Sequence, residues 1–531
     1  MLIPITWFRG VANDYRFGGS NEISLSKHFD ILTYPNRLQP LRGMATESTT
    51  DSEIGNIIVG TNGNLYGVGT NPADGVNGKL WVRADNNTTA SSTGSYSASS
   101  TWRSLTTNQL SGVVMRTGDY NFLVDYPDAG NVRTMHWAST NLLIASDPLG
   151  ASSATTQALT FSTISNGFVH PKDKILYFGY QTGSGATYIG KIASNATPFA
   201  GLSTTALQLP SQYQVTSLSY WNNYLTIACS STASGNGVNS SVVFLWDRDT
   251  SLATVSESIP WGGGKLVALN NLNGVLVGVS SQSAATTSSV QDSDSVFIKT
   301  WNGGSEPIVE KEIIAQHTIA TLAPSVLVHP NVNFICRNRL YFSVDIIPTD
   351  GSTATYGLWS VGRGESGRFV TTVERMATNT GTETGVLAAA IAGDFVSIAH
   401  TAVGTLTYTI NGATSTTTYG ATSVIESCVN PNMKLEYRLK KKKLMKNIAT
   451  FSPLVSGQSV VLKYRVDCLR TTAFTTIATA STVGDTRLEM PGLSDGTAFT
   501  DGTDFEFALQ TAGGVFITGW AYVVELMDTQ I

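Results

Sequence analysis

The side chains best suited to chemistry, histidines and carboxylates, are spaced in a way that predicts no local catalytic or metal site. The histidines form no HxH, HExxH or HxxxH pair, so we expect no sequence-local zinc site. Asp119, Asp125 and Asp128 lie close together, but closeness in a loop does not give two carboxylates the separation that a glycosidase needs. No phosphate-binding loop or nucleophile elbow is present. We therefore expect a protein that is not an enzyme and uses no cofactor or metal. The six histidines are His28, His136, His170, His317, His329 and His400.

A dense run of positive charge is the strongest charge feature of the chain. Residues 434–446 hold seven basic residues and one acidic residue. One interpretation is a solvated strand whose lysines protect a sheet edge from unwanted pairing. The alternatives are an electrostatic seam against an acidic neighbouring subunit, or contact with DNA that passes through a channel. The candidate interface or channel residues are Arg438, Lys440, Lys441, Lys442, Lys443 and Lys446.

The composition indicates an all-β protein with a substantial core. Charged residues make up only 13% of the 531 residues, whereas hydrophobic residues make up 41%. A surface rich in Ser, Thr and Gly and poor in Glu and Lys disfavours long exposed helices. The net charge of −5 gives no general attraction to nucleic acid or anionic membranes. We also expect no membrane span, synthesis in a cytoplasm, and four cysteines that are buried free thiols.

A short apolar strand recurs through the middle of the chain at intervals of about 55 residues. Each copy is followed by a second strand that often ends in an aromatic residue, which predicts an antiparallel pair. The period suits one propeller blade, whereas separate β-sandwiches need about 100 residues each. We therefore predict a six- or seven-bladed β-propeller. The strand anchors are Leu65, Phe122, Leu176, Leu225, Leu276, Leu340 and Phe395.

The two ends of the chain lack this repeat. We predict an N-terminal arm over 1–45, the propeller over 46–425 and a C-terminal β-sandwich domain over 426–531. Short strands separated by turn residues suggest the sandwich. Within it, apolar residues at 460, 462, 464 and 466 alternate with Val461, Lys463 and Arg465, the period of two expected of a half-buried strand.

Distinct patterns mark the two ends of the chain. At the start they are 8–14, 29–31, Leu38 and Pro40. At the end they are the lysine-rich strand, 457–467, 474–477 and 504–509. These patterns resemble those of tail-associated β-propeller structural proteins of tailed bacteriophages. The resemblance implies a virion component at the tail nozzle, tail tip or fibre attachment. It also implies assembly with identical subunits in a ring or trimer and contacts with other tail proteins.

The principal rival is a propeller at the tail tip that binds or cleaves a host surface glycan, with aromatic side chains from blade loops stacking on sugars. Candidates for such stacking are Trp221, Trp246, Trp261 and Trp301, although we expect these rings to lie in the core between blades. A third possibility is an intracellular kelch-like adaptor, which would lack both end patterns.

Overall fold

The fold is taken from a computed structural model of the whole chain. The residues that it describes are 1–7, 22–32, 37–41, 44–48, 53–60, 65–70, 78–83, 103–104, 123–128, 131–138, 142–146, 155–193, 202–231, 240–252, 254–282, 295–314, 325–347, 355–364, 367–378, 386–392, 395–400, 405–410, 422–466, 473–490 and 501–527.

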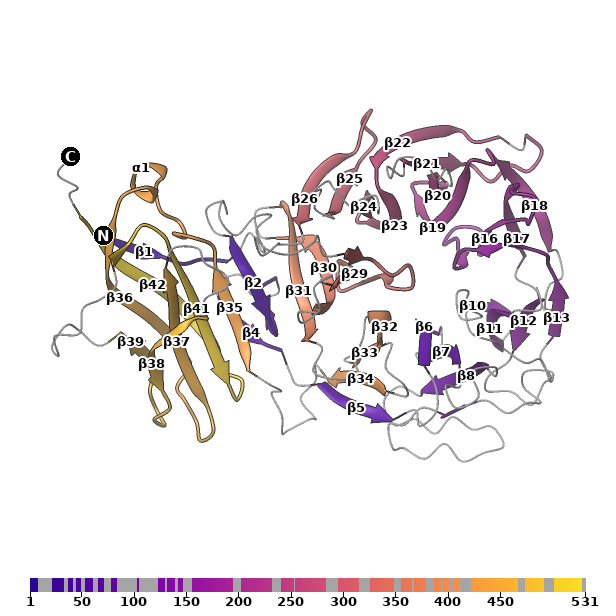
Figure 1. Cartoon of the computed structure of the whole chain (residues 1–531). Coiled ribbons are helices and arrows are strands. Elements are labelled where there is room, and N and C mark those ends of the chain that lie inside the picture. The colour runs from indigo at the N-terminus through magenta and orange to yellow at the C-terminus, as the bar shows by residue number, and fades with distance from the viewer. Residues whose placement is uncertain are drawn as a thin grey trace.

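Antiparallel sheets arranged in a closed ring make up most of the molecule (Figure 1). Among the described residues the ring contains seven such sheets, each with at least four strands. Each sheet is one blade of a β-propeller. The predicted all-β fold is confirmed, and the blade count is the higher of the two expected values.

The first four blades run from residue 53 to residue 263. Blade 1 contains β6 (Glu53–Val59), β7 (Leu65–Thr70), β8 (Gly78–Arg83) and β9 (Arg103–Ser104). Blade 2 contains β10 (Leu123–Asp128), β11 (Asn131–Ala138), β12 (Leu142–Ser146) and β13 (Thr155–Ala158). Blade 3 contains β14 (Thr163–Ile164), β15 (Phe168–Val169), β16 (Leu176–Gln181), β17 (Thr187–Ile192) and β18 (Ser203–Leu209). Blade 4 contains β19 (Tyr213–Trp221), β20 (Tyr224–Ser231), β21 (Ser240–Trp246) and β22 (Glu257–Gly263).

The last three blades complete the circle. Blade 5 contains β23 (Lys265–Leu272), β24 (Val275–Gln282), β25 (Ser295–Trp301) and β26 (Ile308–Ile314). Blade 6 contains β27 (Ser325–Leu327), β28 (Asn333–Cys336), β29 (Arg339–Ile347), β30 (Thr355–Arg363) and β31 (Phe369–Thr378). Blade 7 contains β32 (Val386–Ala392), β33 (Phe395–His400), β34 (Thr405–Ile410) and β5 (Met44–Ser48).

The recurring strand pair of the sequence is a hairpin within each blade. In blade 4, Leu225 of β20 faces Trp246 of β21, and in blade 5, Leu276 of β24 faces Trp301 of β25. The anchors of blades 1, 3, 6 and 7 pair in the same antiparallel way with the following strand. The anchor of blade 2, Phe122, lies outside the described residues, and β10 begins at the next position. The predicted antiparallel pairing is confirmed in these blades.

The ring is closed by a strand from the N-terminal side of the chain. β5 pairs antiparallel with β34, so blade 7 takes three strands from the end of the repeat and one from before its beginning. Because these strands are more than 350 residues apart, their ladder joins the two ends of the propeller sequence.

Two further sheets form a sandwich beside the ring (Figure 1). One sheet has the order β1-β42-β36-β39, with β40 also paired to β36, and the other has the order β2-β35-β41-β37-β38. The strands of the first sheet are β1 (Leu2–Pro4), β36 (Lys442–Phe451), β39 (Arg487–Glu489), β40 (Asp501–Gly502) and β42 (Ile517–Leu526). Those of the second are β2 (Ile23–Lys27), β35 (Ser423–Ser427), β37 (Ser459–Val466), β38 (Thr475–Ala480) and β41 (Phe505–Ala512).

The N-terminal segment 1–45, which we expected to form an arm, contributes to both parts of the molecule. β1 and β2 join the two sandwich sheets, while β3 (Phe29–Asp30) and β4 (Gln39–Pro40) form a small hairpin. The single described helix is one turn, α1 (Leu435–Arg438), between β35 and β36. In the predicted half-buried strand, Val460 and Leu462 are buried as expected, but Tyr464 and Val466 are only half-buried. Arg465, expected on the solvent face, is buried because it pairs with Glu506.

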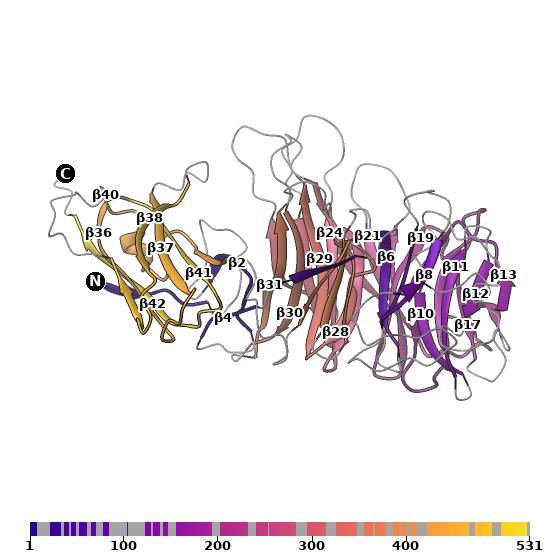
Figure 2. The same cartoon turned by 90° about the horizontal axis from the view of Figure 1, so that it is seen from below.

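The sandwich and the ring share a continuous apolar core. One cluster of buried side chains includes Val277 of blade 5, Val361 of blade 6, Phe29 of the N-terminal segment and Phe507 of the sandwich. A second view shows the sandwich beside the ring rather than over its central axis (Figure 2). The part of the N-terminal segment that contains β2 and β3 therefore lies in the joint between the two domains.

Candidate functional site

The basic segment lies around α1, at the top of the sandwich in Figure 1. Its lysines do not protect a sheet edge, because β36 pairs with β42 on one side and with β39 and β40 on the other. The interpretation as an edge-protecting strand is therefore wrong. The alternation of the strand, not its charge, decides which side chains are accessible.

Lys442 is fully buried and serves the local backbone. Its ammonium group donates hydrogen bonds to the carbonyl oxygens of Arg438 (2.8 Å) and Lys440 (2.7 Å), and also to that of Thr503. Burial lowers the pKa of Lys442 to about 8, although the nearby carboxylate of Asp504 acts in the opposite direction. This lysine closes the turn between α1 and β36 and cannot reach a partner.

The remaining basic residues are partly occupied within the sandwich. Lys446 pairs with Glu489 at 2.5 Å, and the Arg438 Nε donates to the carbonyl of Met433. Lys443 is half-buried. Lys441 is exposed and lies 3.7 Å from the carboxylate of Asp501, a loose surface pair.

The exposed part of the segment combines charge with apolar side chains. Leu435 and Leu439 are 80% and 89% exposed. We call Lys434, Leu435, Leu439, Lys440 and Lys441 the distal tip. Contact between this tip and an acidic neighbouring subunit stays a prediction.

The candidate tryptophans lie in the cores between blades: Trp246 packs with Tyr177 between blades 3 and 4, and Trp221, Trp261 and Trp301 lie between blades 4 and 5. Trp246, Trp261 and Trp301 are at most 3% exposed, so none of them can stack on a sugar. Trp221 is half-buried, donates from Nε1 to the carbonyl of Gly274 in blade 5, and has its ring centroid 4.7 Å from that of Trp301. The expectation of an inter-blade core is confirmed for these rings.

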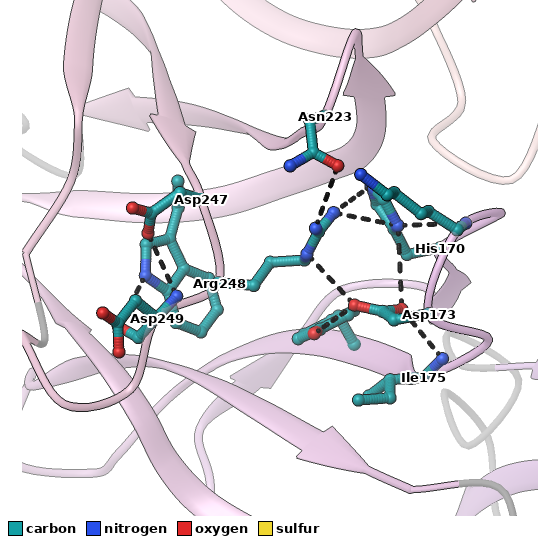
Figure 3. Close-up of polar contacts among 10 residues, drawn as sticks. His170, Asp173, Ile175, Asn223, Asp247, Arg248 and Asp249 are labelled. Atoms are coloured by element: carbon teal, nitrogen blue, oxygen red, sulfur yellow. Dashed lines mark hydrogen bonds and ion pairs between the residues drawn. The ribbon is translucent and has the colours of Figure 1, made fainter.

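A polar cluster joins blades 3 and 4 (Figure 3). His170 and Asp173 follow β15, and Arg248 follows β21. The guanidinium Nη1 of Arg248 lies 2.6 Å from His170 Nε2, and its Nε lies 3.0 Å from the carboxylate of Asp173. Asn223 accepts from Arg248 Nη2 at 3.3 Å, and the hydroxyl of Tyr177 donates to Asp173 at 3.0 Å.

Local turns set the position of these side chains. The carboxylates of Asp247 and Asp249 each accept the backbone N–H two residues further along the chain, at 3.0 and 2.8 Å. Such turns favour the left-handed backbone that Arg248 adopts, with a φ of 71°. Asp173 makes the same kind of contact with the N–H of Ile175.

The electrostatics of this cluster suit a structural contact between blades 3 and 4 rather than a proton-transfer site. Burial, assisted by the neighbouring Arg248, lowers the pKa of His170, so its ring is neutral at neutral pH. The carboxylate of Asp173 is held by the cation and by Tyr177, whose pKa is raised by burial and by that carboxylate. The printed contacts of His170, Asp173 and Arg248 run to one another, to the adjoining blade and to their own turns.

The centre of the propeller holds a second polar arrangement, made of amides. Asn56 of blade 1 donates to Asn166 of blade 3 (2.8 Å), which donates to Asn331 of blade 6 (2.9 Å). Asn270 of blade 5 donates to Asn333 of blade 6 (2.6 Å), and Asn333 donates to the hydroxyl of Ser217 in blade 4 (2.8 Å). These bonds link five blades across the central axis.

Sequence reasoning missed both polar arrangements. It treated His170 as isolated because Arg248 is 78 residues away in the chain. The central amides do leave a signal, since an Asn or Ser occurs six to ten residues before the anchors of blades 1 and 3 to 6. That position lies on or beside the innermost strand, but the sequence alone does not show that these strands meet.

Other expectations concern groups that could bind metals or act in catalysis. The side chains of Asp119, Asp125 and Asp128 lie outside the described residues. Among the residues that are described, no three His, Cys, Asp or Glu side chains converge as metal ligands. Cys229 and Cys428 are buried free thiols, and Cys336 is a partly buried one. Within the described ranges no helix is long and apolar enough to cross a membrane.

No protein-family model matches the chain, and no curated protein matches it in sequence. Among solved structures, the chain is similar to the β-propeller domain of Cps50 (Swd1) from Myceliophteria thermophila, with 10% identity and a TM-score of 0.39. That match covers 69% of this chain and 98% of the other. Because the likeness is distant, the sheet topology is what identifies the propeller.

Proposed function

We propose that this protein is a structural, non-catalytic component of a bacteriophage tail, at the nozzle, the tail tip or a fibre attachment point. It works by contacts with identical copies in a ring or trimer and with other tail proteins. Its site of action is the virion, after synthesis in the bacterial cytoplasm.

The proposal rests on the way the two ends of the chain meet. The segments that carry the resemblance to phage tail proteins come from opposite ends of the sequence. In the fold, the β3–β4 hairpin lies beside β35, and Leu38 bridges to Ile517 of the sandwich that also contains β36, β37 and β41. The pattern at 8–14 lies outside the described residues. If the patterns at both ends belong to one structural module, they should lie close together in the fold. Chance similarities would be scattered over the molecule.

The use of polar groups is consistent with a structural role. The cluster of buried His170 with half-buried Asp173 and Arg248 makes contacts between blades. The buried ammonium of Lys442 donates hydrogen bonds to backbone carbonyls. Such groups stabilise one arrangement of sheets and supply surfaces of fixed shape to neighbours.

The distal tip is the surface that we assign to contact with a tail protein. It combines two exposed leucines with Lys440 and Lys441, and it lies around α1 at the top of the sandwich (Figure 1). An apolar centre with a charged rim is the usual anatomy of a protein interface. Its positive charge predicts an acidic partner surface.

The test is incorporation of the protein into particles. A phage that lacks the gene is complemented with the wild-type chain or with Lys440→Glu/Lys441→Glu, and the protein in purified virions is measured by quantitative mass spectrometry. We expect a fixed copy number per particle for the wild type and a fall of about tenfold or more for the charge-reversed variant.

Lys172→Glu/Lys174→Glu is the matched control, because it reverses two exposed lysines on blade 3. We expect this control to enter particles like the wild type. Absence of the wild-type protein from purified virions would overturn the tail assignment. Equal incorporation of both variants would leave the tail assignment standing and remove the distal tip as the contact surface.

A further inference from the structure

The central channel of the propeller contains a cavity of about 680 Å³. The innermost strands of six blades line it, through β6, β14 and β15, β19, β23, β28 and β32. Cavities of a few hundred to about 1,000 Å³ are typical of small-molecule sites. The cavity is separate from the distal tip and from the polar cluster of His170, Asp173 and Arg248 between blades 3 and 4.

The amides that line this cavity retain hydrogen-bonding capacity. A side-chain amide has two N–H donors and an oxygen with two lone pairs. Asn166 and Asn331 each donate one N–H and accept one hydrogen bond within the channel, as does Asn333. Among the described residues, each of these amides therefore keeps one donor and one acceptor position for another molecule. The network also fixes the amides in orientation before anything binds.

The charge and aromatic content of the wall narrow the class of ligand. Lys265 is the single charged side chain among the described residues of the wall. Phe168 and Phe334 also line the cavity and are half-buried. The ring of Phe334 is stacked on Tyr341 at 5.0 Å, which holds it in place. Fixed amides beside aromatic rings suit a molecule with many hydroxyl groups and apolar C–H faces.

We propose that the central channel binds a short, uncharged oligosaccharide. The amides of Asn166, Asn331 and Asn333 exchange paired hydrogen bonds with sugar hydroxyls, and Phe168 and Phe334 contact the faces of the sugar rings. This assigns glycan recognition to the channel rather than to the buried tryptophans. It adds a binding site to the structural role and does not depend on it.

The first measurement uses saturation-transfer NMR on the full chain with maltotriose, cellotriose and triacetylchitotriose at millimolar concentration. We expect at least one of these probes to bind, and its Kd is then measured by calorimetry. Two variants block the cavity from different walls without removing an amide: Ile335→Trp and Val59→Trp, at positions 39% and 40% exposed. Each should weaken binding by about tenfold or more.

Val309→Trp is the matched control, because Val309 is 54% exposed on β26 and does not line the cavity. It should bind like the wild type. Failure of all three probes to bind the wild-type chain, or unchanged binding by both blocking variants, would overturn the proposal. Circular dichroism and thermal unfolding confirm that each variant is folded, and a misfolded blocking variant leaves the decision to the other one. Particle incorporation is measured separately, so failure here does not affect the tail assignment.

Discussion

At the scale of single residues, burial separates side chains that look alike in the sequence. Residues 440–443 are four consecutive lysines, and nothing in their identity distinguishes one from the next. In the fold, Lys442 is buried and donates hydrogen bonds to three backbone carbonyls, while Lys440 and Lys441 are exposed. Strand alternation could have suggested this, because Lys442 shares the phase of buried Leu444. The carbonyl acceptors could not be predicted, since Thr503 is 61 residues away.

Replacing Lys442 with Met should destabilise the sandwich, because it leaves buried carbonyl oxygens without a donor. The loss of charge-assisted hydrogen bonds is expected to cost about 1.5–3 kcal/mol in the free energy of unfolding. Lys441→Met, on the exposed neighbour, should change it by less than about 0.5 kcal/mol. Denaturant unfolding at pH 7 measures both, and equal stability of the two variants would contradict the role assigned to Lys442.

The same lysine should give stability a pH dependence of known sign. Its pKa of about 8 in the folded chain is below its ordinary value of 10.5, so between these limits the unfolded chain binds more protons. Stability contributed by this group therefore rises as the pH rises from about 8 to about 10.5. The advantage of the wild type over Lys442→Met should increase across that window, and a decrease would show that the lysine stays charged.

At the scale of elements, the repeat predicts the middle hairpin of each blade but not the strands that complete the sheets. Anchors such as Leu225 and Leu276 are found because continuous apolar runs mark strands buried on both faces. β1, β2 and β5 are short and carry no repeat, and their partners are hundreds of residues away. Pairing between strands so far apart in the chain leaves no local pattern in the sequence. The sequence could therefore predict only that the N-terminal segment forms an arm.

Closure of the ring through β5 predicts that its backbone is needed for stability. Ala45 and Thr46 face Tyr408 and Thr407 of β34, and in an antiparallel ladder one of two adjacent N–H groups must point to the partner. Ala45→Pro/Thr46→Pro removes that donor and should cost on the order of 2 kcal/mol. Ala45→Ser/Thr46→Ser keeps both N–H groups and serves as control. Thermal unfolding compares them, and equal midpoints would show that blade 7 closes without this ladder.

At the scale of the whole molecule, the N-terminal segment ties the sandwich to the ring by charge as well as by apolar contact. Arg339 of blade 6 pairs with Asp30 (3.3 Å) and with Glu374 of its own blade (2.7 Å). Lys311 of blade 5 pairs with Glu22 at 2.7 Å. All of these side chains are less than a fifth exposed, so the pairs are poorly screened. The ring and the sandwich should therefore unfold together.

Glu22→Gln/Asp30→Asn tests this coupling, because it removes both bridging carboxylates and leaves the pair within blade 6 intact. We expect one calorimetric transition for the wild type and two for the variant. Removing each bridge should cost on the order of 1–3 kcal/mol, and this cost weakens only the contact between the sandwich and the ring. Glu489→Gln/Asp501→Asn removes two exposed pairs inside the sandwich and should keep the single transition. Two transitions in the wild type would show that the domains are independent. A single transition in the Glu22→Gln/Asp30→Asn variant would show that the shared apolar core holds them together without these charges.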